Sequence, residues 1–346
     1  MKYKTIEGKR VWSHLTKISL FMLIYFTTPA CVPAQSLTEH GFAASPQTKM
    51  KKVVLIAGKK SHAPGDHEYE KGVKLLKECL DNSPNVKGIQ TEVYLNGWPD
   101  DFSVLDNADT ILFFSDGSDR DEQAHPLLHG NRLETLSKLM KHGVGLVAIH
   151  YTVFVPTKKA GDQFLLWIGG YFDYENGPAP KKWYSQIKTQ DYAMLPASAM
   201  HPIAHGLQPF QLREEFYFNI RFAKDHGLIV PILTFATNKD DPTKVVAWAF
   251  ERKDRGRGFA FTGGHFHRNW WDEHMRRMVL NAILWTAKVD VPAGGVKSSL
   301  PAFEDSAEEQ NRSESKPIRA LIVTGHNRPR YADGTPFFFA SATLYP

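Results

Sequence analysis

The chain has 346 residues, of which 42% are hydrophobic and 23% charged. This composition is ordinary for a soluble globular protein, and the length allows one large domain or two modest ones with a proper core. The formal net charge is +5, and five basic residues against one acidic residue in positions 1–34 account for +4 of it, which leaves +1 for the remainder. A nearly neutral remainder argues against nucleic acid or an anionic membrane surface as a partner.

The N-terminus has the order of residues that is typical of a secretion signal. Basic residues lead into the apolar run 18–26, and small residues follow it. This run is much shorter than the roughly 20 apolar residues that a membrane span requires. We therefore expect residues 1–34 to be a signal peptide and the mature protein to be exported, to the periplasm or the cell surface, without a membrane span. An uncleaved anchor or an unstructured tail is the alternative, and Ala30-Cys31 leaves a lipid anchor at Cys31 open.

Cysteine usage fits an exported domain that needs no disulfide. The two cysteines are Cys31, in the predicted signal peptide, and Cys79. Cys79 lies on the apolar stripe of a predicted helix, where a cysteine is far more often core filler than a nucleophile. Residues 35–51 follow the signal peptide and predict a flexible leader.

Alternating strand and helix patterns predict the fold of residues 52–296. Strands are expected at 53–57, 93–95, 111–114, 144–149, 245–249 and 258–262, and helices at 69–80, 133–140 and 275–285. Several of these strands are continuous apolar runs, which is typical of strands buried on both faces. The order predicts an α/β fold with a mostly parallel sheet and helices on both faces. Residues 151–245 have turn signals and short strand patterns, and we expect them to form the walls of a cleft.

The C-terminal part indicates a second, incomplete copy of the same fold. Residues 297–317 are polar and acidic and predict a linker. Residues 318–324 then repeat the pattern of the first strand, and Gly325 follows them as Gly58 follows the first strand. Only 21 residues remain after Gly325, which is too few for a domain. We expect residues 318–346 to be the truncated start of a second copy and to be loosely ordered.

Histidines follow the ends of three predicted strands. They are His62 and His67 after the first strand, His150 after the fourth, and His265 and His267 after the last. Parallel strands present their carboxyl ends at the same edge of a sheet, so these side chains can converge there. Imidazoles with a carboxylate such as Glu215 suit a divalent metal such as zinc, and they equally suit proton transfer on a sugar. The alternative is that each histidine only caps its own strand. Around zinc, the ligand atoms should lie about 3–3.5 Å apart.

Other features are less specific. His125, His129, His142 and His226 lie in polar loop contexts, and we expect them to be exposed. Trp270 either stacks on a sugar ring or anchors the last helix in the core, and the sequence leaves both readings open. No glycine-rich phosphate loop occurs, so no nucleotide cofactor is expected.

These segments resemble the trehalose-utilisation (ThuA-like) family over residues 52–296. The motifs that carry the resemblance are 53–58 with His67-Glu68-Tyr69, His150-Tyr151, 168–171, His201-Pro202-Ile203, 214–219, 263–270 and 281–285. The resemblance implies a flavodoxin-like fold of the class I glutamine-amidotransferase type and a link to the breakdown of disaccharides or oxidised sugars. Amidotransferases carry a catalytic cysteine at the sharp turn after the corresponding strand, and His150 stands there in this chain. A thioester mechanism therefore has no nucleophile, and no amidotransferase activity is expected.

The resulting hypothesis is an exported enzyme that acts on a small saccharide or keto-sugar. The expected catalytic residues are His150, Glu215 and His265. The expected substrate-binding residues are His67, Tyr151, Tyr217, His267 and Trp270. The expected metal ligands are His62, His150 and His265. The rival hypothesis is a non-catalytic saccharide-binding module on the same fold, and convergence of the strand-end histidines would favour the enzyme.

Overall fold

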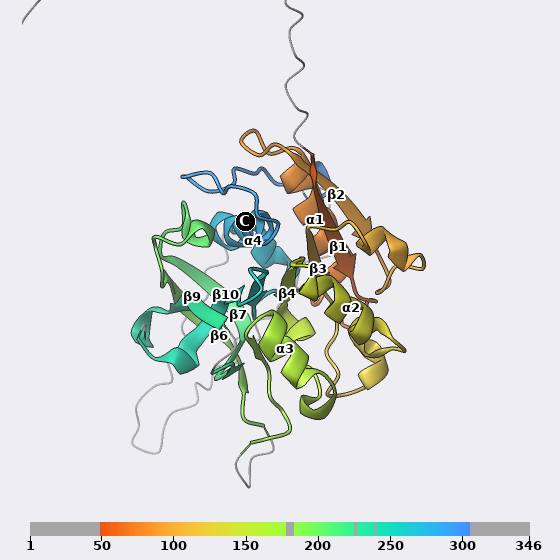
Figure 1. Ribbon diagram of the computed structural model, residues 1–346. Coiled ribbons are helices and arrows are strands. Elements are labelled where there is room, and N and C mark those ends of the chain that lie inside the picture. The colour runs from red at the N-terminus through yellow and green to blue at the C-terminus, as the bar shows by residue number, and fades with distance from the viewer. Residues whose placement is uncertain (1–48, 178–182, 225–226, 239, 305–346) are drawn as a thin grey trace, which may run out of the picture. The chain divides into compact units, whose positions relative to one another are not determined.

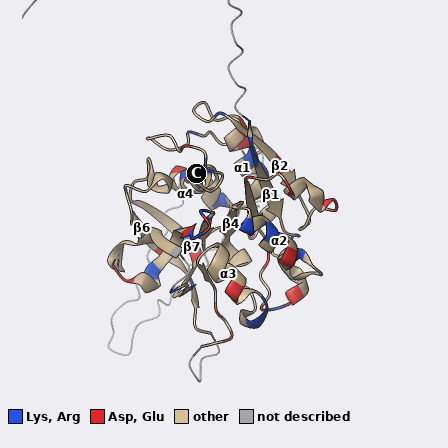
Figure 2. Cartoon of the chain, viewed as in Figure 1, with Lys and Arg blue, Asp and Glu red and all other residues tan. Residues whose placement is uncertain are grey.

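The computed structural model describes residues 49–177, 183–224, 227–238 and 240–304. The predicted signal peptide and the predicted second copy lie outside the described residues, as does most of the predicted leader. None of the helices in the described ranges is long and apolar enough to cross a membrane. Lys and Arg residues are interspersed with Asp and Glu residues over these helices and loops (Figure 2).

A nine-stranded sheet forms the centre of the described chain, in the order β2-β1-β3-β4-β11-β10-β9-β6-β7 (Figure 1). Its parallel part consists of β1 (Lys51–Ala57), β2 (Ile89–Tyr94), β3 (Thr110–Phe114), β4 (Gly145–Ile149) and β11 (Arg257–Phe261). The antiparallel continuation consists of β10 (Val245–Arg252), β9 (Gly227–Phe235), β6 (Gln186–Pro196) and β7 (Phe210–Phe218). A separate antiparallel pair is formed by β5 (Gly170–Tyr171) and β8 (Arg221–Phe222).

Helices cover both faces of the parallel part, because its strands are apolar on both sides. The helices α1 (Tyr69–Asp81) and α4 (Glu273–Thr286) cover one face, and α2 (Arg132–Lys141) and α3 (Asp162–Trp167) cover the other (Figure 1). The pleat divides β1 between them, since Leu55 packs in the cluster of α1 and α4 and Ile56 in the cluster of α2 and α3. The expected α/β fold class is thereby confirmed.

The segment expected to be irregular contributes three long strands to this sheet. Strand β6 has 11 residues, and β7 and β9 have nine each. The expectation of short strands in residues 151–245 was therefore wrong. Two features hide the pattern: only two of the 11 residues of β6 are buried, and β7 carries the charged run Arg213-Glu214-Glu215 in which Glu214 is fully buried. A buried carboxylate satisfied by backbone donors breaks the apolar alternation that marks a strand.

The first part of the predicted linker packs on the domain. Leu300 lies against the core cluster, and Ser299 accepts a hydrogen bond from the Cys79 Sγ at 3.4 Å. Glu304 is 1% exposed and accepts hydrogen bonds from His267 Nε2 and Trp271 Nε1, at 3.0 Å and 2.9 Å. Residues 297–304 thus belong to the folded domain, because the buried Glu304 carboxylate and its two nitrogen partners hold the segment against it. Cys79 is buried in the core, as expected.

The loops after β1 and β3 approach each other closely, which shapes the edge of the sheet where the site lies. Gly58 ends β1, and a Cβ atom at that position would lie 2.6 Å from Ser115 Cβ. A residue with a side chain would therefore push the two loops apart. This close approach brings Ser61 and His62 next to Asp116.

Trp270 is part of the core rather than of a ligand surface. It is fully buried and packs edge-on against Phe114, with ring centroids 5.8 Å apart. We predict that Trp270→Ala lowers the free energy of unfolding by about 3–5 kcal/mol, because it leaves a large cavity. Urea denaturation measures this loss, and Phe102→Ala, which truncates a side chain that is 51% exposed, is the control with little effect. A loss below about 1 kcal/mol for Trp270→Ala would contradict the core assignment.

Candidate metal centre

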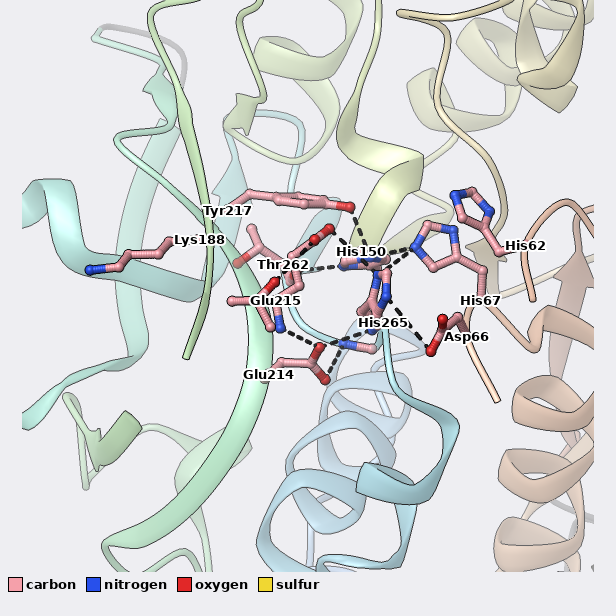
Figure 3. A network of polar contacts seen from close by, with 12 residues as sticks. His62, Asp66, His67, His150, Lys188, Glu214, Glu215, Tyr217, Thr262 and His265 are labelled. Atoms are coloured by element: carbon pink, nitrogen blue, oxygen red, sulfur yellow. Dashed lines mark hydrogen bonds and ion pairs between the residues drawn. The ribbon is translucent and has the colours of Figure 1, made fainter. Parts of the chain in front are cut away.

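Four of the predicted site residues meet at the carboxyl edge of the parallel strands (Figure 3). His67 lies in the loop after β1, His150 directly after β4, and His265 in the loop after β11, while Glu215 projects from β7. One ligand atom from each lies within 4.8 Å of those of the other three. The convergence expected from the strand ends is therefore present in the structure.

His150 occupies the sharp turn at the end of β4 and is held in one orientation. It begins the 3-10 helix His150–Val153, its φ is +52°, and its side chain is fully buried. Its Nδ1 lies 2.7 Å from the backbone oxygen of Thr262. A carbonyl oxygen can only accept, so Nδ1 carries the proton of the neutral ring and Nε2 carries a lone pair. Burial lowers the pKa of His150 well below its usual value, which keeps the ring neutral at pH 7.

His67 is oriented in the same way by a chain of two hydrogen bonds. Its φ is +49°, and its Nδ1 lies 2.7 Å from Tyr69 Oη. The Tyr69 hydroxyl donates to Asp116 Oδ1 at 2.6 Å, so it must accept from His67 Nδ1. The His67 Nε2 therefore carries the lone pair. Burial lowers the pKa of His67, which favours the neutral ring.

The two lone pairs face each other. His150 Nε2 and His67 Nε2 are 3.0 Å apart, and the hydroxyl of Tyr217 lies 2.8 Å from the same His150 nitrogen. Two neutral imidazoles with facing lone pairs repel each other at this distance. A cation between them would remove the repulsion. The hydrogen bonds on both Nδ1 atoms are those that a histidine makes when its other nitrogen binds a metal.

His265 and Glu215 complete the set. His265 Nδ1 lies 2.8 Å from His67 Nε2 and 3.5 Å from Glu215 Oε1. Burial would lower the pKa of His265, but the Glu215 carboxylate outweighs it and the pKa is raised. Burial would raise the pKa of Glu215, but the hydrogen bond and the charge of His265 outweigh it, and the pKa is lowered. The carboxylate is therefore charged at pH 7. The distances of 2.8, 3.0 and 3.5 Å are close to the spacing expected around zinc.

Glu214 positions the loop that carries His265, a role that sequence reasoning did not assign. Its carboxylate accepts hydrogen bonds from the backbone N–H groups of Glu215, Gly264 and His265, at 2.7, 3.0 and 3.2 Å. The Asn269 side chain donates to it as well, at 2.9 Å. Burial raises the pKa of Glu214 to about 7, against the effect of these donors. The period of two in strand β7 turns Glu214 into the protein and leaves Glu215 at the site.

His62 lies beside the four-residue set rather than in it. Its ring lies against that of His67, with centroids 3.7 Å apart and the ring planes tilted by 39°, and its Nδ1 lies 2.7 Å from Ser61 Oγ. Ser61 donates to Asp116 Oδ1 at 2.7 Å, so Nδ1 of His62 is the donor to Ser61 and Nε2 carries the lone pair. Of the predicted metal set of His62, His150 and His265, the structure brings His150 and His265 together with His67, whose Nε2 points at the other two rings, while His62 groups with His67 and Asp116.

Two of the predicted substrate-binding tyrosines border the site. The Tyr217 ring stacks on His150 with centroids 4.5 Å apart. The Tyr151 ring lies 5.5 Å from that of His67, and its hydroxyl donates to Asp119 at 2.5 Å. Both side chains are almost fully buried.

His267 and Trp270 do not lie at the metal centre. The Nε2 atom of His267 is bound to Glu304, and the core encloses Trp270. Both residues belong to the 3-10 helix His267–Trp271, which packs them away from the other histidines. The structure therefore does not bring these two predicted substrate-binding residues to the candidate metal centre.

Asp116 and Tyr69 are site residues that the sequence analysis did not single out. Asp116 follows the end of β3, so the same strand-end argument that selected His150 applies to it. Tyr69 is the first residue of α1 and reads as part of its apolar stripe. The hydrogen bond of its hydroxyl group could not be predicted from the apolar pattern of the helix, because only the packing of α1 beside β3 brings Tyr69 to Asp116.

Comparison with known proteins gives the class of fold first. A ThuA-like protein from Bacteroides uniformis superposes with a TM-score of 0.50 and 16% identity, covering 72% of this chain and 97% of that one. A ThuA-like protein from Parabacteroides merdae covers 73% and 94% at a TM-score of 0.46 and 16% identity. A glutamine amidotransferase from Thermotoga maritima covers 69% and 96% at a TM-score of 0.34 and 8% identity. The match at a TM-score of 0.50 shows that this chain shares its α/β fold with the ThuA-like protein from Bacteroides uniformis.

The family follows from the sequence itself. The model of the ThuA family, described as trehalose utilisation, matches residues 53–286. The chain belongs to this family, which confirms the resemblance. A search among curated proteins found no match.

His125 makes the stability of the protein depend on pH. It is fully buried rather than exposed as expected, and its Nε2 donates to the backbone oxygen of Thr152 in the turn that begins at His150. Burial lowers its pKa to about 4, against 6.5 in an exposed histidine. Below pH 6.5 the unfolded chain therefore binds a proton at His125 that the folded protein does not bind. The free energy of unfolding decreases as the pH falls.

We predict that His125 alone lowers the free energy of unfolding by about 2 kcal/mol between pH 7.5 and pH 5.0. Urea denaturation at the two pH values measures the loss. His125→Gln keeps a donor to Thr152 but does not titrate, so its loss should be smaller by that amount. Equal losses in the two proteins would show that His125 is not responsible.

Proposed function

We propose that the protein is a divalent-metal-dependent enzyme that acts on a saccharide or keto-sugar. The observation that carries this proposal is the set of three imidazole nitrogens and one carboxylate oxygen, from His67, His150, His265 and Glu215, within 4.8 Å of one another. The nitrogens of His67 and His150 that face the centre both carry lone pairs, since their Nδ1 protons are engaged elsewhere.

Zinc fits this set best. Three histidines with one carboxylate are a borderline ligand set, which suits zinc and other first-row divalent ions rather than magnesium or calcium. Both oriented rings are neutral at pH 7, so protons do not compete with the metal at His67 and His150.

The chemistry proposed is proton transfer next to a sugar carbonyl. A metal bound here would supply a Lewis acid that polarises a carbonyl or hydroxyl oxygen of the substrate. His62 has its Nε2 lone pair available and is the more exposed of the imidazoles around Asp116, so it suits the role of base. Burial raises the pKa of Tyr217 well above its usual value, so its phenol stays protonated. Its hydroxyl donates to His150 Nε2 at 2.8 Å, and a metal that took this lone pair would free the O–H to donate to developing charge on the substrate.

The saccharide substrate is proposed from the family description of trehalose utilisation. The rival proposal, a saccharide-binding module without catalysis, would not need oriented imidazoles at one point. Their convergence supports the enzyme. The turn after β4 has a histidine, His150, where a thioester mechanism needs a thiol. Cys79, the one cysteine among the described residues, is buried against Ser299 instead.

We predict that the purified protein binds about one zinc ion per chain, measured by mass spectrometry of the metal content after dialysis. His150→Ala should weaken zinc binding by roughly 100-fold or more, since loss of even a second-shell partner costs 10–100-fold. His142→Ala, which removes an exposed histidine, is the matched control and should retain the metal. Retention of one zinc ion by His150→Ala, or its absence from the unmodified protein, would refute the metal proposal.

We also propose that the protein is exported to the periplasm or the cell surface. The basic N-terminus, the short apolar run at 18–26 and the small residues after it support this proposal. N-terminal sequencing of the protein from its native host should begin near Gln35, or show a lipid-modified Cys31. Recovery of a chain that still begins at Met1 from the cytoplasm would contradict export.

A further inference from the structure

A cavity of about 350 Å³ lies beside the metal centre. Its volume is within the range of small-molecule sites. The lining side chains that matter here are Asp66, Lys71, Phe266, Arg268 and Trp271. They combine two aromatic rings with charged groups of both signs, and neither the metal set nor the proton-transfer residues use them.

The walls of this cavity are fixed by backbone pairing. Residues 65–67 and 265–267 run antiparallel, with a bridge between Asp66 and Phe266. The His67 N–H donates to the His265 oxygen, and the His267 N–H donates to the Gly65 oxygen, both at 2.8 Å. The same two segments carry the metal ligands His67 and His265, so the cavity and the metal centre share one rigid frame.

The segment at 297–304 closes the cavity on another side. Glu304 lines it and accepts hydrogen bonds from Trp271 Nε1 and His267 Nε2. The Trp271 indole is thereby held in place while its residue remains partly exposed. Preorganised aromatic side chains lose little conformational entropy when a partner stacks on them.

Asp66 belongs both to the cavity and to the surroundings of the metal centre. It lines the cavity, and its Oδ1 lies 3.8 Å from Nε2 of the proposed metal ligand His265 (Figure 3). The cavity is therefore next to the proposed metal set.

We infer that this cavity is a second sugar subsite, which binds the ring of a disaccharide that is not at the metal centre; the inference rests on the proposed function. Trp271 is the stacking platform, because the Arg268 guanidinium lies over the Phe266 ring at 5.5 Å. Lys71 and Arg268 donate to sugar hydroxyls and Asp66 accepts from them. The cavity has two cationic side chains, Lys71 and Arg268, and two anionic ones, Asp66 and Glu304, and this balance favours a neutral ring over a phosphorylated or acidic one.

The test is isothermal titration calorimetry of the full chain, loaded with zinc, against trehalose, maltose, cellobiose and glucose. At least one disaccharide should bind 10-fold or more tightly than glucose. Trp271→Ala should lower that disaccharide's affinity about 10-fold and leave the affinity for glucose unchanged. Phe102→Ala removes an exposed aromatic ring outside the cavity and is the matched control.

Lys71→Ala provides a second variant, since Lys71 is exposed on the first turn of α1 and its truncation leaves the core intact. It should weaken the same disaccharide several-fold. Disaccharides that bind no more tightly than glucose, or bind both variants as well as the unmodified protein, would overturn the subsite even if zinc is bound. A Trp271-dependent preference for a disaccharide in a protein that binds no zinc would support the subsite and refute the metal proposal instead.

Discussion

The arrangement of the site depends on one carboxylate. Asp116 Oδ1 accepts hydrogen bonds from the hydroxyls of Ser61 and Tyr69, and each hydroxyl in turn accepts from the Nδ1 of a histidine. One buried charge thus fixes the tautomers of His62 and His67 together. Without it, either ring could place its proton on Nε2, and the lone pair on that nitrogen would be lost.

This constraint explains why the loops around the site are shaped as they are. Gly58 allows the loop after β1 to approach Ser115, which brings Ser61 within reach of Asp116. His67 and His150 both adopt positive φ, an uncommon conformation for residues with a side chain, and such residues cluster at functional sites. Backbone pairing and the Glu214 carboxylate hold the loop of His265 against them. Of the six non-glycine residues with positive φ among the described residues, His67 and His150 lie at the site.

The two halves of the sheet meet at the site. The turn after β4 presents its first side chain, His150, to the edge of the sheet, next to His67 and His265. The antiparallel strands β6 and β7 bring Glu215 to the same point from the other half of the sheet. The four side chains therefore meet only because the parallel and antiparallel parts form one continuous sheet.

Sequence alone determined the alternation of strands and helices, the buried parallel strands and the histidines at their ends, because a buried strand needs a continuous apolar run and parallel strands end at one edge. It could not show that β7 would enter the sheet, since the charged run 213–215 masks its period, and so it gave no role to the buried Glu214 next to the predicted Glu215. It placed Trp270 at the site and chose His62 over His67 as a ligand. Those outcomes depend on side-chain direction: Trp270 turns into the core beside Phe114, and the hydrogen bond to Tyr69 turns His67 Nε2 toward the other two rings. Only tertiary packing decides such directions, because the partners of each side chain come from segments far apart in the chain.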